Sequence, residues 1–188
     1  MEKQKPDIFT KDLWGESITS VLGNILQHIE FRYGKRNPTY TILGIELFDE
    51  GPDIHFSSYD PSYIYIRITP KCRFDMPETV LQVSHEAVHC LHPTTIENVT
   101  YLEEGLATLF SLEYTNSYIG EKYIDNQHYI QASNLVSELL KYKPTIIKEL
   151  RTQESSISMF TPKMLIENCP DIPHDLAEKL TTRFSQSI

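Results

Sequence analysis

The spacing of apolar residues along this chain changes twice, from a helical repeat to a strand repeat and back again. Between residues 11 and 32, apolar side chains recur every three or four positions, which predicts a helix with Ile18 and Ile25 on its buried face. Residues 1–10 lack such a repeat, so we expect a loose tail there. The glycine and proline within residues 33–38 predict a loop that ends the helix.

Three stretches rich in β-branched and aromatic residues follow, at residues 40–48, 54–59 and 62–69. They predict three strands joined by turns at glycine-proline and aspartate-proline pairs. In the third stretch isoleucine occupies every second position, which is the repeat of a half-buried strand. Two placements fit this strand: an edge, whose free backbone groups could pair with an extended peptide, or the interior of the sheet.

Helical repeats return after residue 75 and continue toward the end of the chain. We expect helices at residues 76–92, 101–118, 125–142, 144–151, 162–168 and 172–184. The short connection between the first two predicts a helix hairpin. Strands in one block and helices in others indicate the α+β class.

The composition is that of one globular domain: 188 residues, of which 40% are hydrophobic and 23% charged. We divide it into the tail, a region of helix, sheet and hairpin at residues 11–119, and a helical C-terminal subregion at residues 120–188. The net charge of −9 argues against nucleic acid and membrane partners, because those surfaces require clustered lysine and arginine. Without an export signal, a membrane-length apolar stretch or paired cysteine spacing, we expect a cytoplasmic protein free of disulfides.

The most informative motif is H-E-x-x-H, at residues 85–89 of the first hairpin helix. Residues four apart lie on one helix face, so the rings of His85 and His89 can converge on one metal ion. Glu86 lies on the shoulder of the same face, within reach of a water molecule at the metal. This arrangement is typical of a catalytic zinc site, in which a carboxylate takes the proton of the metal-bound water.

The residues around the motif favour a helix. Asp75 is suited to be the N-cap, Pro77 to the first turn, and Pro93 ends the pattern. Val80 and Cys90 fall on the side away from the histidines, so we expect them in the core.

A third metal ligand is expected from Glu103 or Glu104, early in the second hairpin helix. Glu104 shares its face mainly with small residues and adjoins Gly105, which would let this face approach a partner closely. Glu103 lines up instead with Leu106 and Phe110. We therefore favour Glu104 and keep Glu103 as the alternative.

His92 competes for the same role, because it lies seven residues beyond His85 and would share its face on an uninterrupted helix. The following Pro93 disfavours helical backbone at His92, which argues against it.

Hydrolysis at a zinc site usually needs a hydrogen-bond donor for the negatively charged oxygen of the transition state. The sequence offers several tyrosines and histidines for this role and does not choose among them. The candidates are Tyr101, Tyr118, Tyr123, His128, Tyr129 and His174.

The H-E-x-x-H motif at residues 85–89, followed by E-G-L-A at residues 104–107, resembles the gluzincin family of zinc peptidases. The resemblance implies a zincin-like fold, with a small sheet packed on the active-site helix and substrate lying along an edge strand. It implies one Zn²⁺ ion bound by His85, His89 and Glu104, with Glu86 as the general base. The compact length is similar to that of single-domain members.

We therefore expect a zinc metallopeptidase acting on peptide or protein substrates. The alternative is a zincin-fold, metal-binding protein with little or no turnover that acts as a binding or regulatory module. A third hypothesis, a purely structural α+β domain, predicts that no metal is bound.

Overall fold

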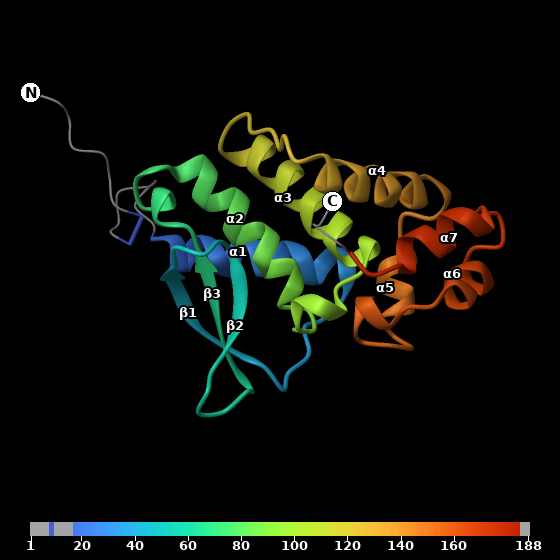
Figure 1. The fold of residues 1–188 in the computed structure, drawn as a ribbon, viewed down its shortest axis with the longest axis horizontal. Helices are drawn as coiled ribbons and strands as arrows, with labels where there is room; N and C mark the ends of the chain where they lie inside the picture. The colour runs from blue at the N-terminus through green and yellow to red at the C-terminus, as the bar shows by residue number, and fades with distance from the viewer. Residues whose placement is uncertain (1–7, 10–16, 185–188) are drawn as a thin grey trace, which may run out of the picture.

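A computed structural model of the chain describes residues 8–9 and 17–184 (Figure 1). The elements in chain order are α1 (Ile18–Tyr33), β1 (Thr41–Leu47), β2 (Asp53–Phe56), β3 (Tyr63–Ile68), the 3₁₀ turn η1 (Pro70–Phe74), α2 (Met76–His89), η2 (Ile96–Asn98), α3 (Tyr101–Tyr118), α4 (Gln127–Tyr142), α5 (Ile146–Leu150), η3 (Ile157–Met159), α6 (Pro162–Asn168) and α7 (His174–Thr181). This confirms the α+β class. The start of the helix expected from residue 11 lies outside the described residues. Of the expected tail, only Ile8 and Phe9 are described, and Ile8 is buried.

The sheet has three strands in the order β1-β3-β2, so β3 is the interior strand. It pairs in parallel with β1 and antiparallel with β2. Its isoleucines Ile64, Ile66 and Ile68 are fully buried, as expected of a strand with a neighbour on each side and a helix packed on one face. Of the two placements considered for residues 62–69, the interior one is confirmed, and β2 is an edge strand.

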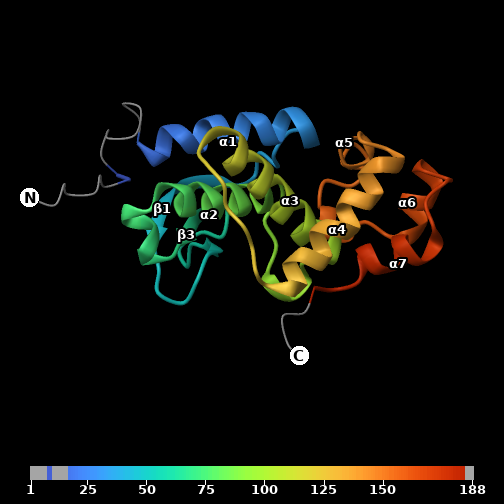
Figure 2. The ribbon, with the colours of Figure 1, turned by 90° about the horizontal axis from the view of Figure 1, so that it is seen from above.

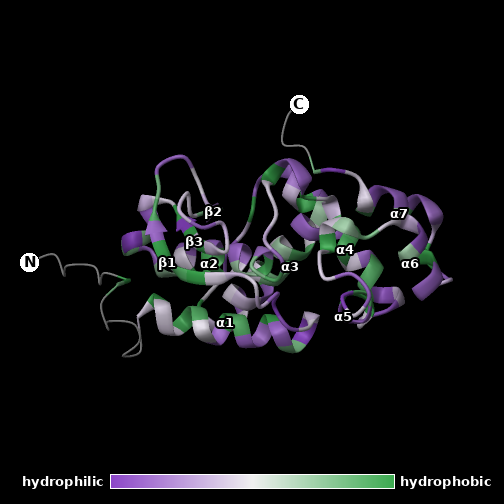
Figure 3. Ribbon diagram, turned by 90° about the horizontal axis from the view of Figure 1, so that it is seen from below, coloured by the Kyte–Doolittle hydropathy of each residue, from purple (hydrophilic) through white to green (hydrophobic). Residues whose placement is uncertain are grey.

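Helices α1 and α2 lie on one side of the sheet, whereas α4 to α7 gather beyond α3, away from the strands (Figures 1 and 2). The central helices α2 and α3 carry hydrophobic residues, and the outer turns of α7 are hydrophilic (Figure 3). Within the described residues, no helix combines the length and apolar character needed to cross a membrane.

The hairpin of α2 and α3 is capped as the sequence predicts. Asp75 accepts a hydrogen bond from the Glu78 N–H at the start of α2, and Thr100 caps α3 through the Glu103 N–H. The α2 helix ends at His89, earlier than the expected residue 92. The Leu91 N–H bonds to the Val88 carbonyl, three residues back, which tightens the chain and takes it out of the helix before the proline.

Arg151 joins the C-terminal helices to the rest of the molecule. Its guanidinium donates to the carbonyls of Tyr33, Gly34, Lys35, Leu91 and Ser155. Five backbone acceptors around one cation fix the end of α1 and the end of α2 relative to α5. The end of the motif helix is therefore held in place from the C-terminal part of the chain.

Candidate metal centre

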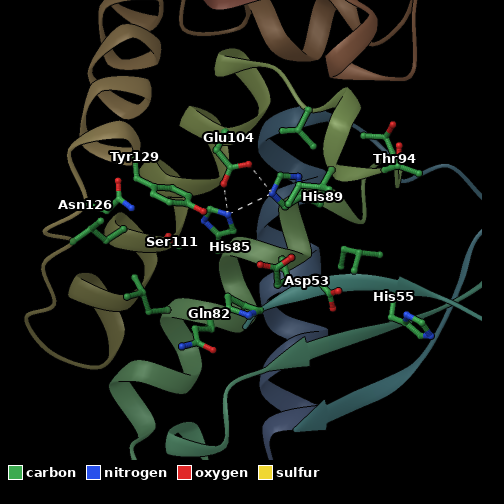
Figure 4. A pocket seen from close by; sticks show the side chains of 18 of the residues that line it. Asp53, His55, Gln82, His85, His89, Thr94, Glu104, Ser111, Asn126 and Tyr129 are labelled. Atoms are coloured by element: carbon green, nitrogen blue, oxygen red, sulfur yellow. Dashed lines mark hydrogen bonds and ion pairs between the residues drawn. The ribbon is translucent and has the colours of Figure 1, made fainter. Parts of the chain in front are cut away.

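Three side chains from the neighbouring helices α2 and α3 converge at the middle of the molecule (Figure 4). His85 Nε2 lies 2.8 Å from one carboxylate oxygen of Glu104. His89 Nε2 lies 3.4 Å from His85 Nε2 and 3.6 Å from the other Glu104 oxygen. The two ring nitrogens and the carboxylate therefore face one common point.

The spacing of these atoms fits a metal ion. Nitrogen and oxygen ligands about 2.0–2.1 Å from a tetrahedral zinc are separated from one another by about 3.3–3.4 Å. The three separations in the structure, 2.8, 3.4 and 3.6 Å, lie around that value. Two imidazoles and one carboxylate are also a donor set that divalent transition metals accept. His85, His89 and Glu104 could therefore hold a metal ion.

Glu103 occupies a different position from its neighbour Glu104. Its carboxylate lies 2.9 Å from His89 Nδ1, on the ring edge opposite the metal point, and it also accepts a hydrogen bond from the Ser158 hydroxyl. A carboxylate at Nδ1 keeps the proton on that nitrogen and leaves the Nε2 lone pair for a ligand bond. The two consecutive glutamates therefore occupy different positions, Glu104 at the point shared with both Nε2 atoms and Glu103 at Nδ1 of His89.

The electrostatic field at this point favours a cation. Burial by itself would lower the pKa of His89, but the hydrogen bond to Glu103 and the charges of Glu104 and Glu86 outweigh it and raise this pKa to about 10. Burial would raise the pKa of Glu104, but the neighbouring His85 and His89 lower it. A site that holds positive charge so strongly is suited to a divalent ion, which would take the place of the proton on His89 Nε2.

Glu86 lies beside the three converging residues, in the same cleft. Its side chain is buried, and this burial raises its pKa above the usual carboxyl range despite the nearby histidines. A carboxylate with a raised pKa is a stronger base than an exposed one, so Glu86 is suited to accept a proton.

No family model, curated protein or solved structure matches this chain. Its chemistry therefore has to be inferred from its own residues and their geometry.

A cleft of about 750 Å³ opens over the three converging residues. One wall is strand β2, and the others come from the connection between α2 and α3 and from the start of α4. Tyr129 points into the cleft with its ring 5.9 Å from that of His85 (Figure 4). Burial, together with the charges of Glu104 and Glu86, raises the pKa of Tyr129, so its hydroxyl stays protonated.

The other five candidates for a transition-state donor do not line the cleft. Tyr101 makes an edge-to-face contact with Phe184, with ring centres 5.1 Å apart. Tyr118 and Tyr123 are exposed on the far part of α3 and the loop after it. His128 and His174 begin α4 and α7 without facing the cleft. Only their position in three dimensions separates these residues from Tyr129.

His92 points away from the point on which His85, His89 and Glu104 converge. Its Nδ1 lies 2.8 Å from the Ser155 hydroxyl and 3.3 Å from the Asn37 amide, on the far side of the α2 terminus. The early end of α2 is the physical reason, because it removes His92 from the face shared by His85 and His89. All three cysteines are buried and unpaired, in keeping with the prediction that no disulfide forms.

Proposed function

We propose that this chain is a zinc-dependent peptidase with a zincin-like fold and a gluzincin-type ligand set. The observation that carries the proposal is the convergence of His85, His89 and Glu104 beside Glu86, at the base of a cleft large enough for a peptide. A zinc ion bound there would polarise the scissile carbonyl and lower the pKa of water.

The chain's own residues supply the proton transfer and part of the charge stabilisation. Glu86 accepts a proton from the attacking water and returns it to the leaving amine. Tyr129 donates a hydrogen bond from its hydroxyl to the oxygen that gains negative charge, because its raised pKa keeps the phenol protonated. Glu103 holds the His89 ring in the tautomer that binds metal.

The substrate is expected to lie along β2, the edge strand, rather than along β3. The Ser57 N–H donates to the Tyr63 carbonyl at 2.8 Å. In the antiparallel register His55 and Asp53 occupy equivalent positions, so their backbone groups point toward β3. Ile54 and Phe56 therefore direct their backbone groups to the open edge, and both residues line the cleft. A peptide could add to this edge as a further strand.

The direct test is the Glu86→Gln variant, which keeps the size of the side chain and removes the base. We expect stoichiometric zinc by elemental analysis and a loss of peptide hydrolysis of about 10²–10⁴-fold. The matched control is Glu138→Gln, an exposed glutamate on α4 outside the cleft, which should hydrolyse peptides at the wild-type rate.

Two results would contradict the proposal. One is a Glu86→Gln protein that is as active as the wild type. The other is a zinc-loaded wild-type protein that cleaves no member of a diverse peptide library, which would favour the non-catalytic binding module instead.

A further inference from the structure

The segment that follows α7, residues 182–184, pairs with the backbone at the start of α3. The Phe184 N–H donates to the Val99 carbonyl at 2.8 Å, and the Thr182 carbonyl accepts from the Tyr101 N–H at 3.0 Å. These two bonds flank an antiparallel β-bridge. We call residues 182–184 the strap. Its backbone is held against the helix that carries the proposed carboxylate ligand.

The side chain of Phe184 extends from the strap to two tyrosines. Its ring centre lies 5.1 Å from that of Tyr101 on α3 and 5.2 Å from that of Tyr129 on α4. The strap, which follows α7 and is drawn in red, reaches the first turn of α4 (Figure 2). Phe184 therefore connects the first turns of two helices. The contact joins segments far apart in the sequence, so no local pattern could have predicted it.

Tyr129 has a second aromatic contact, toward the metal centre. Its ring centre lies 5.9 Å from that of His85, and its hydroxyl end points toward His85 and Glu104 (Figure 4). The rings of Phe184, Tyr129 and His85 therefore form a continuous row from the strap to the metal centre. Because tilted and edge-to-face ring pairs favour particular orientations, the two contacts limit how the Tyr129 ring can turn.

Tyr129 lies at the margin of the packed part of α4. The buried residues of this helix begin at Ala132, whereas Tyr129 is half-buried. A half-buried side chain has room for more than one staggered χ1 position. A ring contact from outside the helix can therefore select the rotamer whose hydroxyl faces the cleft.

We propose that Phe184 is a positioning residue, whose ring holds the Tyr129 side chain with its hydroxyl directed at the metal centre. The catalytic consequence rests on the proposed peptidase function, whereas the contact itself does not. A hydrogen-bond donor that is already in place needs no reorganisation when the transition state forms. Loss of the Phe184 ring should therefore lower kcat and leave KM nearly unchanged.

The contact is tested on the full-length protein with 3-fluorotyrosine in place of Tyr129, by ¹⁹F NMR. We expect the fluorine shift to move toward that of the free amino acid in Phe184→Leu and in Phe184→Met, which remove the neighbouring ring. In Phe184→Tyr, which keeps the ring, the shift should stay close to that of the wild type. The matched control is Phe31→Leu, the same change at an exposed phenylalanine of α1 outside the cleft, which should leave the shift unchanged.

The catalytic consequence is tested with a quenched fluorescent peptide that the wild type cleaves. Phe184→Leu should lower kcat about 3–10-fold at similar KM, and Phe184→Tyr should keep the wild-type value. In a Tyr129→Phe background, which has already lost the donor, adding Phe184→Leu should change kcat by less than about twofold. An equal loss in both backgrounds would overturn the inference, because Phe184 would then act independently of Tyr129.

The two readouts separate a failure of this inference from a failure of the peptidase proposal. A fluorine shift that is the same in the wild type and in both variants without the ring would overturn the positioning role and leave the peptidase proposal intact. A shift that moves in those variants, together with a wild type that cleaves no peptide, would support the hold on Tyr129 and count against the peptidase.

Discussion

At the scale of single residues, the two consecutive glutamates of α3 illustrate how neighbouring positions acquire different chemistry. Consecutive residues on a helix point about 100° apart, so Glu104 faces the ring nitrogens of both histidines while Glu103 reaches the outer edge of His89. Ser158, from a distant part of the chain, donates to the second oxygen of Glu103. A carboxylate anchored in this way limits the rotation of the His89 ring.

This arrangement predicts graded effects on metal binding. Glu104→Ala should abolish tight zinc binding, because one of three ligands is lost. Glu103→Ala should weaken it by about 10–100-fold, since His89 remains but is no longer oriented. Ser158→Ala should have a smaller effect in the same direction. Competition with a coloured chelator measures all three, and equal losses in Glu103→Ala and Glu104→Ala would contradict the separate tasks assigned here.

At the scale of elements, the site depends on how closely α3 approaches α4. A side chain on Gly105 would meet the Ala132 carbonyl oxygen at 2.2 Å and the Val136 side chain at 2.8 Å. Glycine is therefore required where the two helices touch. This contact lies next to Glu104 on α3 and about one turn from Tyr129 on α4. The spacing of the two helices therefore sets the position of Tyr129 relative to His85.

The same substitution at two glycines should have opposite effects. Gly105→Ala should destabilise the protein by about 1–3 kcal/mol, because backbone atoms must move apart. Gly23→Ala, on α1 with no atoms within 4 Å of the added carbon, should stabilise it by about 0.5–1 kcal/mol through helix propensity. Urea unfolding measures both, and a neutral Gly105→Ala would contradict the close approach.

An ionic cluster fastens the loop between α3 and α4 to the start of α2. Glu78 pairs with Lys71 and with Lys122, each at 2.9 Å, and accepts a hydrogen bond from Gln82. Burial would raise the pKa of Glu78, but these donors outweigh it and lower the pKa to about 2. The loop that carries Lys122 continues directly into the cleft wall before Tyr129.

The lowered pKa gives a pH dependence of defined sign. Because the pKa of Glu78 is lower in the folded than in the unfolded protein, its stabilisation is complete above about pH 4.5 and is lost as the pH falls toward about 2. Glu78→Gln should be less stable than the wild type at pH 6 by about 1–2 kcal/mol, and the difference should narrow below pH 4.5. Urea unfolding at several pH values tests this, with Glu138→Gln as control; a constant difference would contradict it.

At the scale of the whole molecule, the cleft exists only because distant parts of the chain meet. The edge strand β2, the hairpin of α2 and α3, and the start of α4 each supply one wall. Arg151 and Ser158 connect the C-terminal helices to the end of α2 and to Glu103. A metal ion bound at the centre would hold α2 and α3 together, so binding and folding should be coupled.

Zinc should therefore raise the stability of the entire chain. At a free concentration one hundred times the dissociation constant, we expect about 2.7 kcal/mol of added stability, or roughly 5–10 °C in Tm. A chelator should reverse the shift, and His85→Ala should show none. A wild-type protein whose thermal unfolding is unchanged by zinc and by chelator would support the purely structural hypothesis.

The sequence by itself determined the features that depend on local spacing. Histidines four apart with an intervening glutamate, an aspartate cap and a following proline specify a helix with both histidines on one face, and alternating isoleucines specify a buried strand. Helix positions along the chain followed from the same periodicity. The periodicity predicted that α2 ends at residue 92, three residues beyond its end at His89, because the spacing of apolar residues does not show that the chain tightens before the proline.

Only the tertiary structure decided what depends on contacts between distant residues. It separated Glu104 from Glu103, brought Tyr129 alone among six candidates to the cleft, and placed β3 in the interior of the sheet with β2 as an edge strand. The physical reason is that periodicity fixes the direction of a side chain relative to its own helix or strand, whereas the packing of elements fixes what that side chain meets.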